Sequence, residues 1–236
     1  MTTSMDIQRT CEMGSWRHLA NAAKLVIEAN GVDGAGAPLL GGGTRLMLAL
    51  NHRISRDVDL VFEGADPLDL LSPRNNTQAA HIAQAFAEDI GAVVLKTAGG
   101  AITFHAPDRG VRVLDDPEPS LPFALQPVGA VLARLLVQNG PLLSAEDLFD
   151  WWSVQQKMPE AIGPALLGEL LTPIQDDLER ALDRLEAAPK SQAKWDAIEA
   201  PDKPDFGKTL AWARIQRLEY DHAAASLYAA SMDSGM

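Results

Sequence analysis

Two carboxylates, Asp57 and Asp59, are separated by one residue in a segment, residues 57–62, that alternates charged and apolar side chains. This alternation predicts a half-buried strand, and residues i and i+2 of a strand point to the same face. Two unpaired acids side by side repel each other, and a divalent cation removes that conflict. Mg²⁺ is usually held by one or two carboxylates plus substrate phosphates. The pair therefore predicts a metal site for phosphoryl transfer, where two Mg²⁺ ions clamp the attacking and leaving oxygens.

A run of three glycines, Gly41 to Gly43, precedes a short helix-like segment that ends near Leu50. Glycine lets the backbone approach a phosphate, and successive N–H groups at a helix start can hold the anion. Thr44 is expected to cap this helix. The run lacks the Gly-Lys-Ser/Thr of a Walker A loop and the spacing of a dinucleotide-binding fingerprint. A glycine run alone indicates a loop and a lone Asp-x-Asp a solvated strand face, but their combination favours a nucleotide site.

The order of these features carries a family resemblance. A strand, Gly-Gly-Thr, a gap of twelve residues and Asp-x-Asp are similar to the DNA polymerase β-type nucleotidyltransferase superfamily. More narrowly, GGGTRLMLALNHRISRDVDLVF resembles the AbiEii/AbiGii toxin nucleotidyltransferases, whose signature reads approximately Gly-Gly-Thr-x-Leu, His-Arg, Ser, Asp-x-Asp. The residues on those positions are Gly42, Gly43, Thr44, Leu46, His52, Arg53, Ser55, Asp57 and Asp59.

A second match lies in AEDLFDWW, residues 145–152, which resembles the later Arg-Asp-Leu-Tyr-Asp-Leu helix of that family. Asp147 and Asp150 fall on its two acids, spaced i and i+3 on one helical face. The alternative interpretation of these acids is a favourable charge near a helix N-terminus together with a solvated helix face. Ser144 is the expected N-cap of this helix. This sequence departs from the family where Glu146 replaces a basic residue and where the preceding helix offers only Arg134 instead of a lysine.

The resemblance implies a Mg²⁺-dependent transfer of a nucleoside monophosphate from an NTP. Asp57 and Asp59 would hold the metal, and Asp115 would be the third acid, with Asp116 as its alternative at the end of VRVLDD. One carboxylate could assist deprotonation of the acceptor hydroxyl. The residues expected to bind the nucleotide are Gly42, Gly43, Thr44, Arg53, Ser55, Asp147 and Asp150.

The resemblance also implies the toxin of a toxin–antitoxin or phage-defence system. Its acceptor would be RNA such as tRNA, or protein, and a cognate antitoxin protein would be its partner. Two alternatives remain open. One is a small-molecule nucleotidyltransferase of the antibiotic-modifying type. The other is a non-catalytic, degenerate member that acts as a binding protein, since the missing basic residues weaken triphosphate binding.

The patterns predict an α/β (α+β) fold: a nucleotidyltransferase-like mixed sheet flanked by helices in residues 1–120, and a helical C-terminal region in residues 121–236. The proline-rich stretch 116–127 marks the expected boundary. Helices are expected over 15–30 and 77–90, and strands over 92–98, 101–106 and 111–114. After the boundary, helices are expected over 128–138, from Ser144 onward, and over 164–171, 172–187 and 207–230.

Composition excludes several classes of protein. The net charge is −12, with 32 acidic and 20 basic residues, which disfavours general DNA binding. We expect no membrane span, because no run of 18 or more uncharged apolar residues occurs, and the N-terminus does not read as a secretory signal. Cys11 is the only cysteine, so a cytoplasmic protein without disulfides is predicted. The scattered histidines, His18, His81, His105 and His222, lack ligand spacing and are interpreted as structural.

Overall fold

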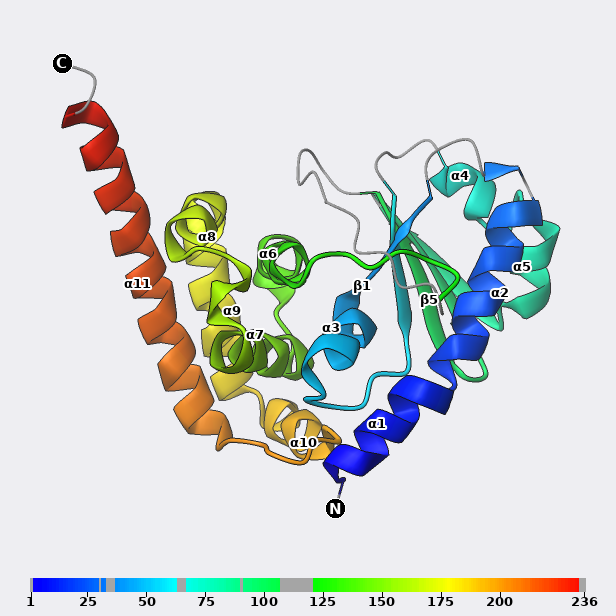
Figure 1. Ribbon diagram of the computed structural model, residues 1–236, viewed down its shortest axis with the longest axis horizontal. Helices are drawn as coiled ribbons and strands as arrows, with labels where there is room; N and C mark the ends of the chain where they lie inside the picture. The colour runs from blue at the N-terminus through cyan, green and yellow to red at the C-terminus, as the bar shows by residue number, and fades with distance from the viewer. Residues whose placement is uncertain are drawn as a thin grey trace. The chain divides into compact units, whose positions relative to one another are not determined.

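The computed structural model describes residues 2–29, 31–32, 37–62, 67–89, 91–106 and 121–233 (Figure 1). The chain divides into two compact units, residues 2–127 and residues 128–236. The first unit holds the β-sheet and the second is helical. No helix within the described ranges is long and apolar enough to cross a membrane.

The sheet of the first unit has five strands in the order β1-β2-β5-β4-β3. Among these described strands β2 pairs parallel with β5, and the other neighbouring strands pair antiparallel. This mixed sheet, flanked by helices, confirms the predicted fold class. The strands are β1 (Leu39–Gly41), β2 (Val58–Val61), β3 (Ala85–Asp89), β4 (Ala92–Thr97) and β5 (Gly100–His105).

The two central strands have one apolar and one polar face. Val58 and Leu60 of β2 and Ile102 and Phe104 of β5 are fully buried in the core. Each such burial stabilises the fold by about 1.5–3 kcal/mol relative to exposure. The helices whose side chains join this core include α1 (Ser4–Met13), α2 (Trp16–Ala29), α4 (Leu68–Leu71) and α5 (Thr77–Ile82). In Figure 1, α2 and α5 lie on one side of the sheet and α3 (Gly42–Leu50) on the other.

The helix predicted over 77–90 is wrong in its second half. The helix α5 ends at Ile82, and residues 85–89 form the edge strand β3. Gln84 N–H donates to Lys96 O at 2.8 Å, and the ladder with β4 continues from there. Pairing with β4 therefore overrides the helix propensity of the alanine-rich segment.

The rest of the predicted strand pattern has a mixed outcome. The predicted hairpin across Gly99 and Gly100 is confirmed, because β4 and β5 pair antiparallel from Thr97 and Gly100 onward. The strand expected at 111–114 lies outside the described residues. The helix α1 has no counterpart in the sequence prediction.

The predicted connector has a structural role in its described part. Leu40 N–H donates to Ala124 O at 2.8 Å, and Gln126 N–H donates to Leu40 O at 2.9 Å. Arg45 Nε then donates to Gln126 O at 2.6 Å. Residues 124–126 therefore pair with the outer edge of β1 and are tied to α3, so that this edge of the sheet is covered.

The helical unit matches most of the expected elements. Ser144 is the N-cap of its second helix, as predicted, and the helix over 164–171 is confirmed with those bounds. The helix α10 was not predicted. The α-helices of this unit are α6 (Val128–Asn139), α7 (Ala145–Lys157), α8 (Pro164–Leu171), α9 (Gln175–Ala187), α10 (Pro189–Ala197) and α11 (Phe206–Asp233).

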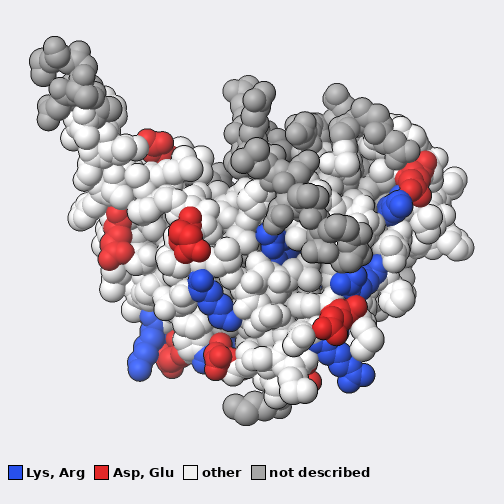
Figure 2. Space-filling view, in the orientation of Figure 1, with Lys and Arg blue, Asp and Glu red and all other residues white. Residues whose placement is uncertain are grey.

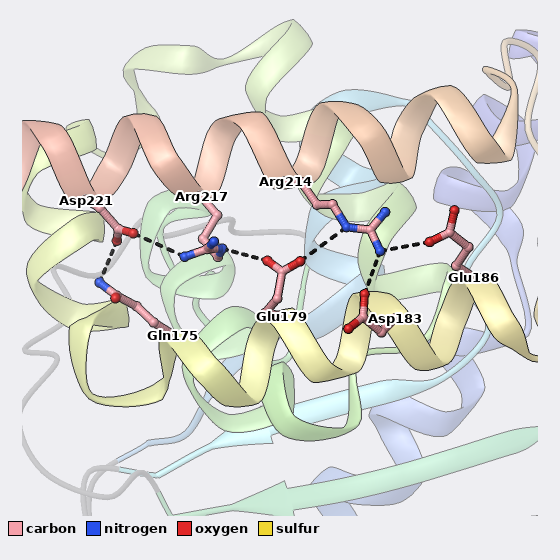
Figure 3. Close-up of polar contacts among 7 residues, drawn as sticks. All are labelled: Gln175, Glu179, Asp183, Glu186, Arg214, Arg217 and Asp221. Atoms are coloured by element: carbon pink, nitrogen blue, oxygen red, sulfur yellow. Dashed lines mark hydrogen bonds and ion pairs between the residues drawn. The ribbon is translucent and has the colours of Figure 1, made fainter.

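An ion-pair network joins α9 to the long helix α11 (Figure 3). Arg214 contacts Glu179, Asp183 and Glu186 at 2.8–3.3 Å. Arg217 shares Glu179 at 2.9 Å and reaches Asp221 at 3.2 Å. Because the arginine side chains are only 27% and 17% exposed and share one carboxylate, the network contributes more than isolated surface pairs do.

Aromatic side chains form the centre of this unit. Trp151 and Tyr220 are buried, and Trp151 Nε1–H donates to Tyr220 Oη at 3.3 Å. The Trp151 ring also lies 5.4 Å from the Trp212 ring, measured between centroids. The contact joins α7 to α11, so one hydrogen bond between side chains 69 residues apart helps to fix two helices.

Replacing Tyr220 with Phe is expected to lower the free energy of unfolding by about 1–3 kcal/mol, because Trp151 Nε1–H loses its acceptor in a buried place. Burial raises the pKa of Tyr220 to about 12. The neutral phenol therefore contributes fully to folding stability below the ordinary pKa of 10.0, and this contribution is lost as pH rises toward 12. Urea unfolding at pH 7 measures the change, and Tyr228→Phe, at a 67% exposed position, is the control. Equal losses in the two variants would contradict the assignment.

Candidate active site

The glycine run forms the turn between β1 and α3. Gly41 is the N-cap of α3, and Gly42 has a positive φ of 62°. A Cβ atom at Gly42 would overlap the Oδ2 atom of Asp59, which is paired with Gly41 across β1 and β2. Glycine is therefore required at position 42 for two reasons: the backbone has a positive φ, and the Asp59 carboxylate leaves no room for a side chain.

The basic turn after α3 folds back onto the start of the same helix. Asn51 ends α3 in the left-handed conformation, with φ at 48°. A Cβ atom at Gly43 would lie 2.5 Å from Arg53 Nη2 and 3.1 Å from Ser55 Oγ. A guanidinium and a hydroxyl thus lie against the first turn of α3, where helical N–H groups have no intrahelical acceptor.

Thr44 occupies a different place from the predicted cap. The N-cap of α3 is Gly41, which makes no side-chain cap bond, and Thr44 stands three residues further on. Thr44 is fully buried, and its hydroxyl donates to Asp57 O at 2.5 Å and lies 3.1 Å from Ser55 Oγ. The hydroxyl therefore ties α3 to the residue that precedes β2 and does not cap the helix.

The two carboxylates are each held through one oxygen by β5. Asp57 lies just before β2, is exposed, and accepts a hydrogen bond from Ala101 N–H at 2.8 Å through Oδ1. Asp59 lies within β2, and its Oδ1 is 3.3 Å from His105 Nε2. The other oxygen of Asp59, Oδ2, lies against Gly42.

These carboxylates fit the chemistry of a Mg²⁺ site. Both supply hard oxygen donors, and Asp59 lies against a helix start that favours anions such as phosphates. Among the residues that the structure describes, no group of three or more His, Cys, Asp or Glu side chains is placed to hold a metal. The described protein ligands for a metal would therefore be Asp57 and Asp59. Two carboxylates are sufficient to bind Mg²⁺ when substrate phosphates complete its coordination. The predicted third acid, Asp115, and its alternative Asp116 lie outside the described residues.

The other predicted site residues are divided between the two units. His52 is buried, with 2% of its surface exposed, and lies in the turn that carries Arg53. Asp147 and Asp150 belong to α7 of the helical unit. Asp147 forms a capping box with Ser144: its Oδ2 accepts from Ser144 N–H at 2.9 Å, and its own N–H donates to Ser144 Oγ at 3.1 Å. Asp147 therefore lies near the helix N-terminus, as the alternative interpretation expected, whereas the solvated face expected there is wrong for Asp150, which is only 1% exposed.

Asp147 offers a test of this capping role. Burial raises the pKa of its carboxyl, although the Ser144 hydrogen bonds oppose the shift. A carboxyl with a raised pKa binds its proton more tightly in the folded state, so its contribution to stability declines as pH rises through that pKa. We expect Asp147→Asn, which keeps the acceptor without the charge, to be at least as stable as the wild type at pH 7. Asp147→Ala, which lacks the acceptor, should lose about 1 kcal/mol. Thermal unfolding measures both, and an Asn variant as unstable as the Ala variant would contradict the capping role.

The sequence interpretation missed two partners of the acids, His105 and the N–H of Ala101. Both lie on β5, where Ala101, Thr103 and His105 alternate with buried residues. That alternation was visible in the sequence and placed His105 on the polar face of its strand. The parallel pairing of β2 with β5 was not visible, and it is this pairing that brings His105 to Asp59.

Comparison with known families shows what this segment of the chain is similar to. Residues 34–122 match the model of the family described as "Nucleotidyl transferase AbiEii toxin, Type IV TA system". Over these residues the chain is similar to the AbiEii family. The matched segment contains both carboxylates, the glycine turn, the basic turn and all five described strands. The resemblance seen in the motif is therefore confirmed.

Structural and sequence searches add little to the AbiEii assignment. The protein JHP933 from Helicobacter pylori superposes with a TM-score of 0.46 at 15% identity, over 92% of this chain and 97% of that one. An H. pylori protein provisionally named a nucleotidyltransferase gives 0.45 and 13%, over 89% and 97%. A search of curated protein sequences gives no match. Because these TM-scores are low, the assignment rests on the sequence match alone.

Proposed function

We propose that the protein is a Mg²⁺-dependent nucleotidyltransferase that transfers a nucleoside monophosphate from an NTP to an acceptor. The observation that carries the proposal is the contact of the Asp59 carboxylate with Gly42, the first residue of α3. A metal-binding acid and a phosphate-binding helix start lie within contact distance of each other. A triphosphate needs both together, because the metal and the phosphate share oxygen ligands.

The residues around the turn take separate parts in binding the triphosphate. The N–H groups of Gly43 and Thr44 lie in the first turn of α3 and hold the β- and γ-phosphates. Arg53 lies against Gly43 and presents its guanidinium fork to a phosphate. Ser55, which contacts both Thr44 and Gly43, supports this turn and offers a hydroxyl.

Asp57 and Asp59 form the metal-binding side of the site. A divalent ion bound by them supplies charge neutralisation and polarisation at the α-phosphate. Asp57 is the more exposed acid and takes the proton of the acceptor hydroxyl as its oxygen attacks phosphorus. The new bond joins the acceptor oxygen to the α-phosphorus, the bond between the α- and β-phosphates breaks, and pyrophosphate leaves. Roles for Asp115, Asp147 and Asp150 stay predictions.

The family description favours a toxin of a toxin–antitoxin system, which would act in the cytoplasm with an antitoxin protein as its counterpart. The acceptor in this proposal is RNA such as tRNA, or protein. Figure 2 shows Lys and Arg side chains interspersed with Asp and Glu over the described part of one face. With a net charge of −12, RNA binding would depend on a local basic groove and would weaken steeply with added salt.

Label transfer tests the reaction and its acceptor in one experiment. The protein is incubated with Mg²⁺ and each α-³²P-labelled NTP in the presence of tRNA, of a protein extract, or of an aminoglycoside. Label on tRNA or protein supports the toxin assignment, and label on the aminoglycoside supports the small-molecule alternative. Absence of transfer and of NTP binding in every arm would favour the non-catalytic alternative. Growth arrest on expression, relieved by the neighbouring gene, tests the toxin role separately.

A further inference from the structure

His105, the last residue of β5, contacts Asp59, one of the two proposed metal-binding acids. His105 Nε2 is 3.3 Å from Asp59 Oδ1, and the two side chains are only 21% and 24% exposed. An ionised carboxylate can only accept a hydrogen bond, so Nε2 is the donor in this pair. In such partly sheltered surroundings the bond is stronger than on an open surface.

The backbone that carries this ring is fixed on both sides. In the parallel ladder Val61 is the register partner of His105, and Phe62 N–H donates to His105 O at 2.8 Å. On the other side Ala92 of β4 is its antiparallel partner. His105 is therefore an interior residue of the sheet, whose position is set before any ligand binds.

The two oxygens of Asp59 have different neighbours. Oδ1 faces His105, and Oδ2 lies against Gly42 at the start of α3. The carboxylate is thus held between a strand and a helix start. If the imidazole were absent, the Asp59 side chain would lose the hydrogen bond that restrains its torsions through Oδ1.

We propose that His105 is a positioning residue for the metal site: it holds Asp59 so that Oδ2 stays directed to the glycine turn. This inference rests on the proposed function, in which Asp59 is a metal ligand. Partners that hydrogen-bond a ligating carboxylate orient it, and their loss lowers metal affinity by about 10- to 100-fold. His105 acts through Asp59 and is not itself assigned as a ligand.

Three substitutions of His105 and two control variants distinguish a positioning role from the effect of side-chain volume. His105→Gln keeps a donor nitrogen near the place of Nε2, whereas His105→Phe fills the space of the ring without a donor, and His105→Ala removes both. His81→Ala on α5, an exposed histidine, is the matched control. Asp59→Asn shows the effect of weakening the ligand itself. Thermal unfolding without metal checks that each variant is folded.

The measurement is the affinity for Mn²⁺, by electron paramagnetic resonance, in the presence of each α,β-methylene nucleoside triphosphate. We expect the Ala and Phe variants to bind Mn²⁺ about 10- to 100-fold more weakly, and the Gln variant to recover most of the affinity. A crystal structure of the metal-free Phe variant should show Asp59 turned away from Gly42.

Three outcomes would overturn the inference, and they are distinguishable. Wild-type affinity in the Ala and Phe variants removes the positioning role and leaves the proposed function intact. Loss of affinity in the Gln variant as well would show that the ring, and not its donor, matters. If the wild type and Asp59→Asn both fail to bind Mn²⁺ with any nucleotide, the proposed function fails and the inference fails with it.

Discussion

Replacing Asp59 with Asn is expected to lower nucleotidyl transfer by about 1000-fold, which corresponds to about 4 kcal/mol of lost transition-state stabilisation. The carboxylate lies beside the start of α3, and the amide that replaces it has nearly the same shape but no charge to offer a cation. The fold should persist, because the side chain is partly exposed and the substitution preserves its volume. Label transfer from NTP under saturating Mg²⁺ measures the loss.

A matched acid in the same unit provides the control for this variant. Asp69 is an exposed residue of α4, and Asp69→Asn removes the same charge away from the glycine turn. Transfer by Asp69→Asn should equal that of the wild type. Equal activity of the Asp59→Asn and wild-type proteins, with both folded, would refute a metal-binding role for Asp59.

Gly42→Ala is expected to lower both folding stability and nucleotide binding. The positive φ of 62° costs a non-glycine residue about 1–3 kcal/mol. The new Cβ atom would in addition overlap Asp59 Oδ2, so the carboxylate must leave its place against the helix start. We therefore expect Mg²⁺-dependent NTP binding to fall about as far as in the Asp59→Asn variant. Urea unfolding and calorimetry measure the two effects.

A Gly31→Ala variant distinguishes the effect of backbone strain from that of the overlap with Asp59. It has a φ of 64°, nearly that of Gly42, but a Cβ atom there would meet nothing within 4 Å. Gly31→Ala should lose stability through strain alone and bind nucleotide as the wild type does. If Gly42→Ala also bound nucleotide normally, the contact between the turn and the carboxylate would have no bearing on the site.

The local part of the site could be predicted because it lies within one short segment. Gly42, Gly43, Arg53, Asp57 and Asp59 are close in sequence, and the strand–turn–helix–strand unit that connects them brings them together. The spacing along the sequence is sufficient to predict this part of the site, because β1 and β2, which α3 connects, are direct neighbours in the sheet.

The features that could not be predicted from the sequence depend on pairing between strands that are distant in the chain. His105 reaches Asp59 only because β5 runs parallel to β2, and nothing in either strand specifies that partner. The same reason explains β3, where an alanine-rich stretch forms a strand because it pairs with the edge of β4. Thr44 has the residue type of a helix cap, yet the glycine turn starts α3 two residues earlier and leaves the threonine in the core.

The central claim is that this turn and its acids bind a metal–nucleotide complex. The most direct test is a calorimetric titration of the wild type and Asp57→Ala with each NTP, with and without Mg²⁺. We predict that the wild type binds one or more NTPs only when Mg²⁺ is present, and that Asp57→Ala loses about 10-fold or more of that affinity. Equal binding by the two proteins, or binding that does not depend on Mg²⁺, would contradict the claim.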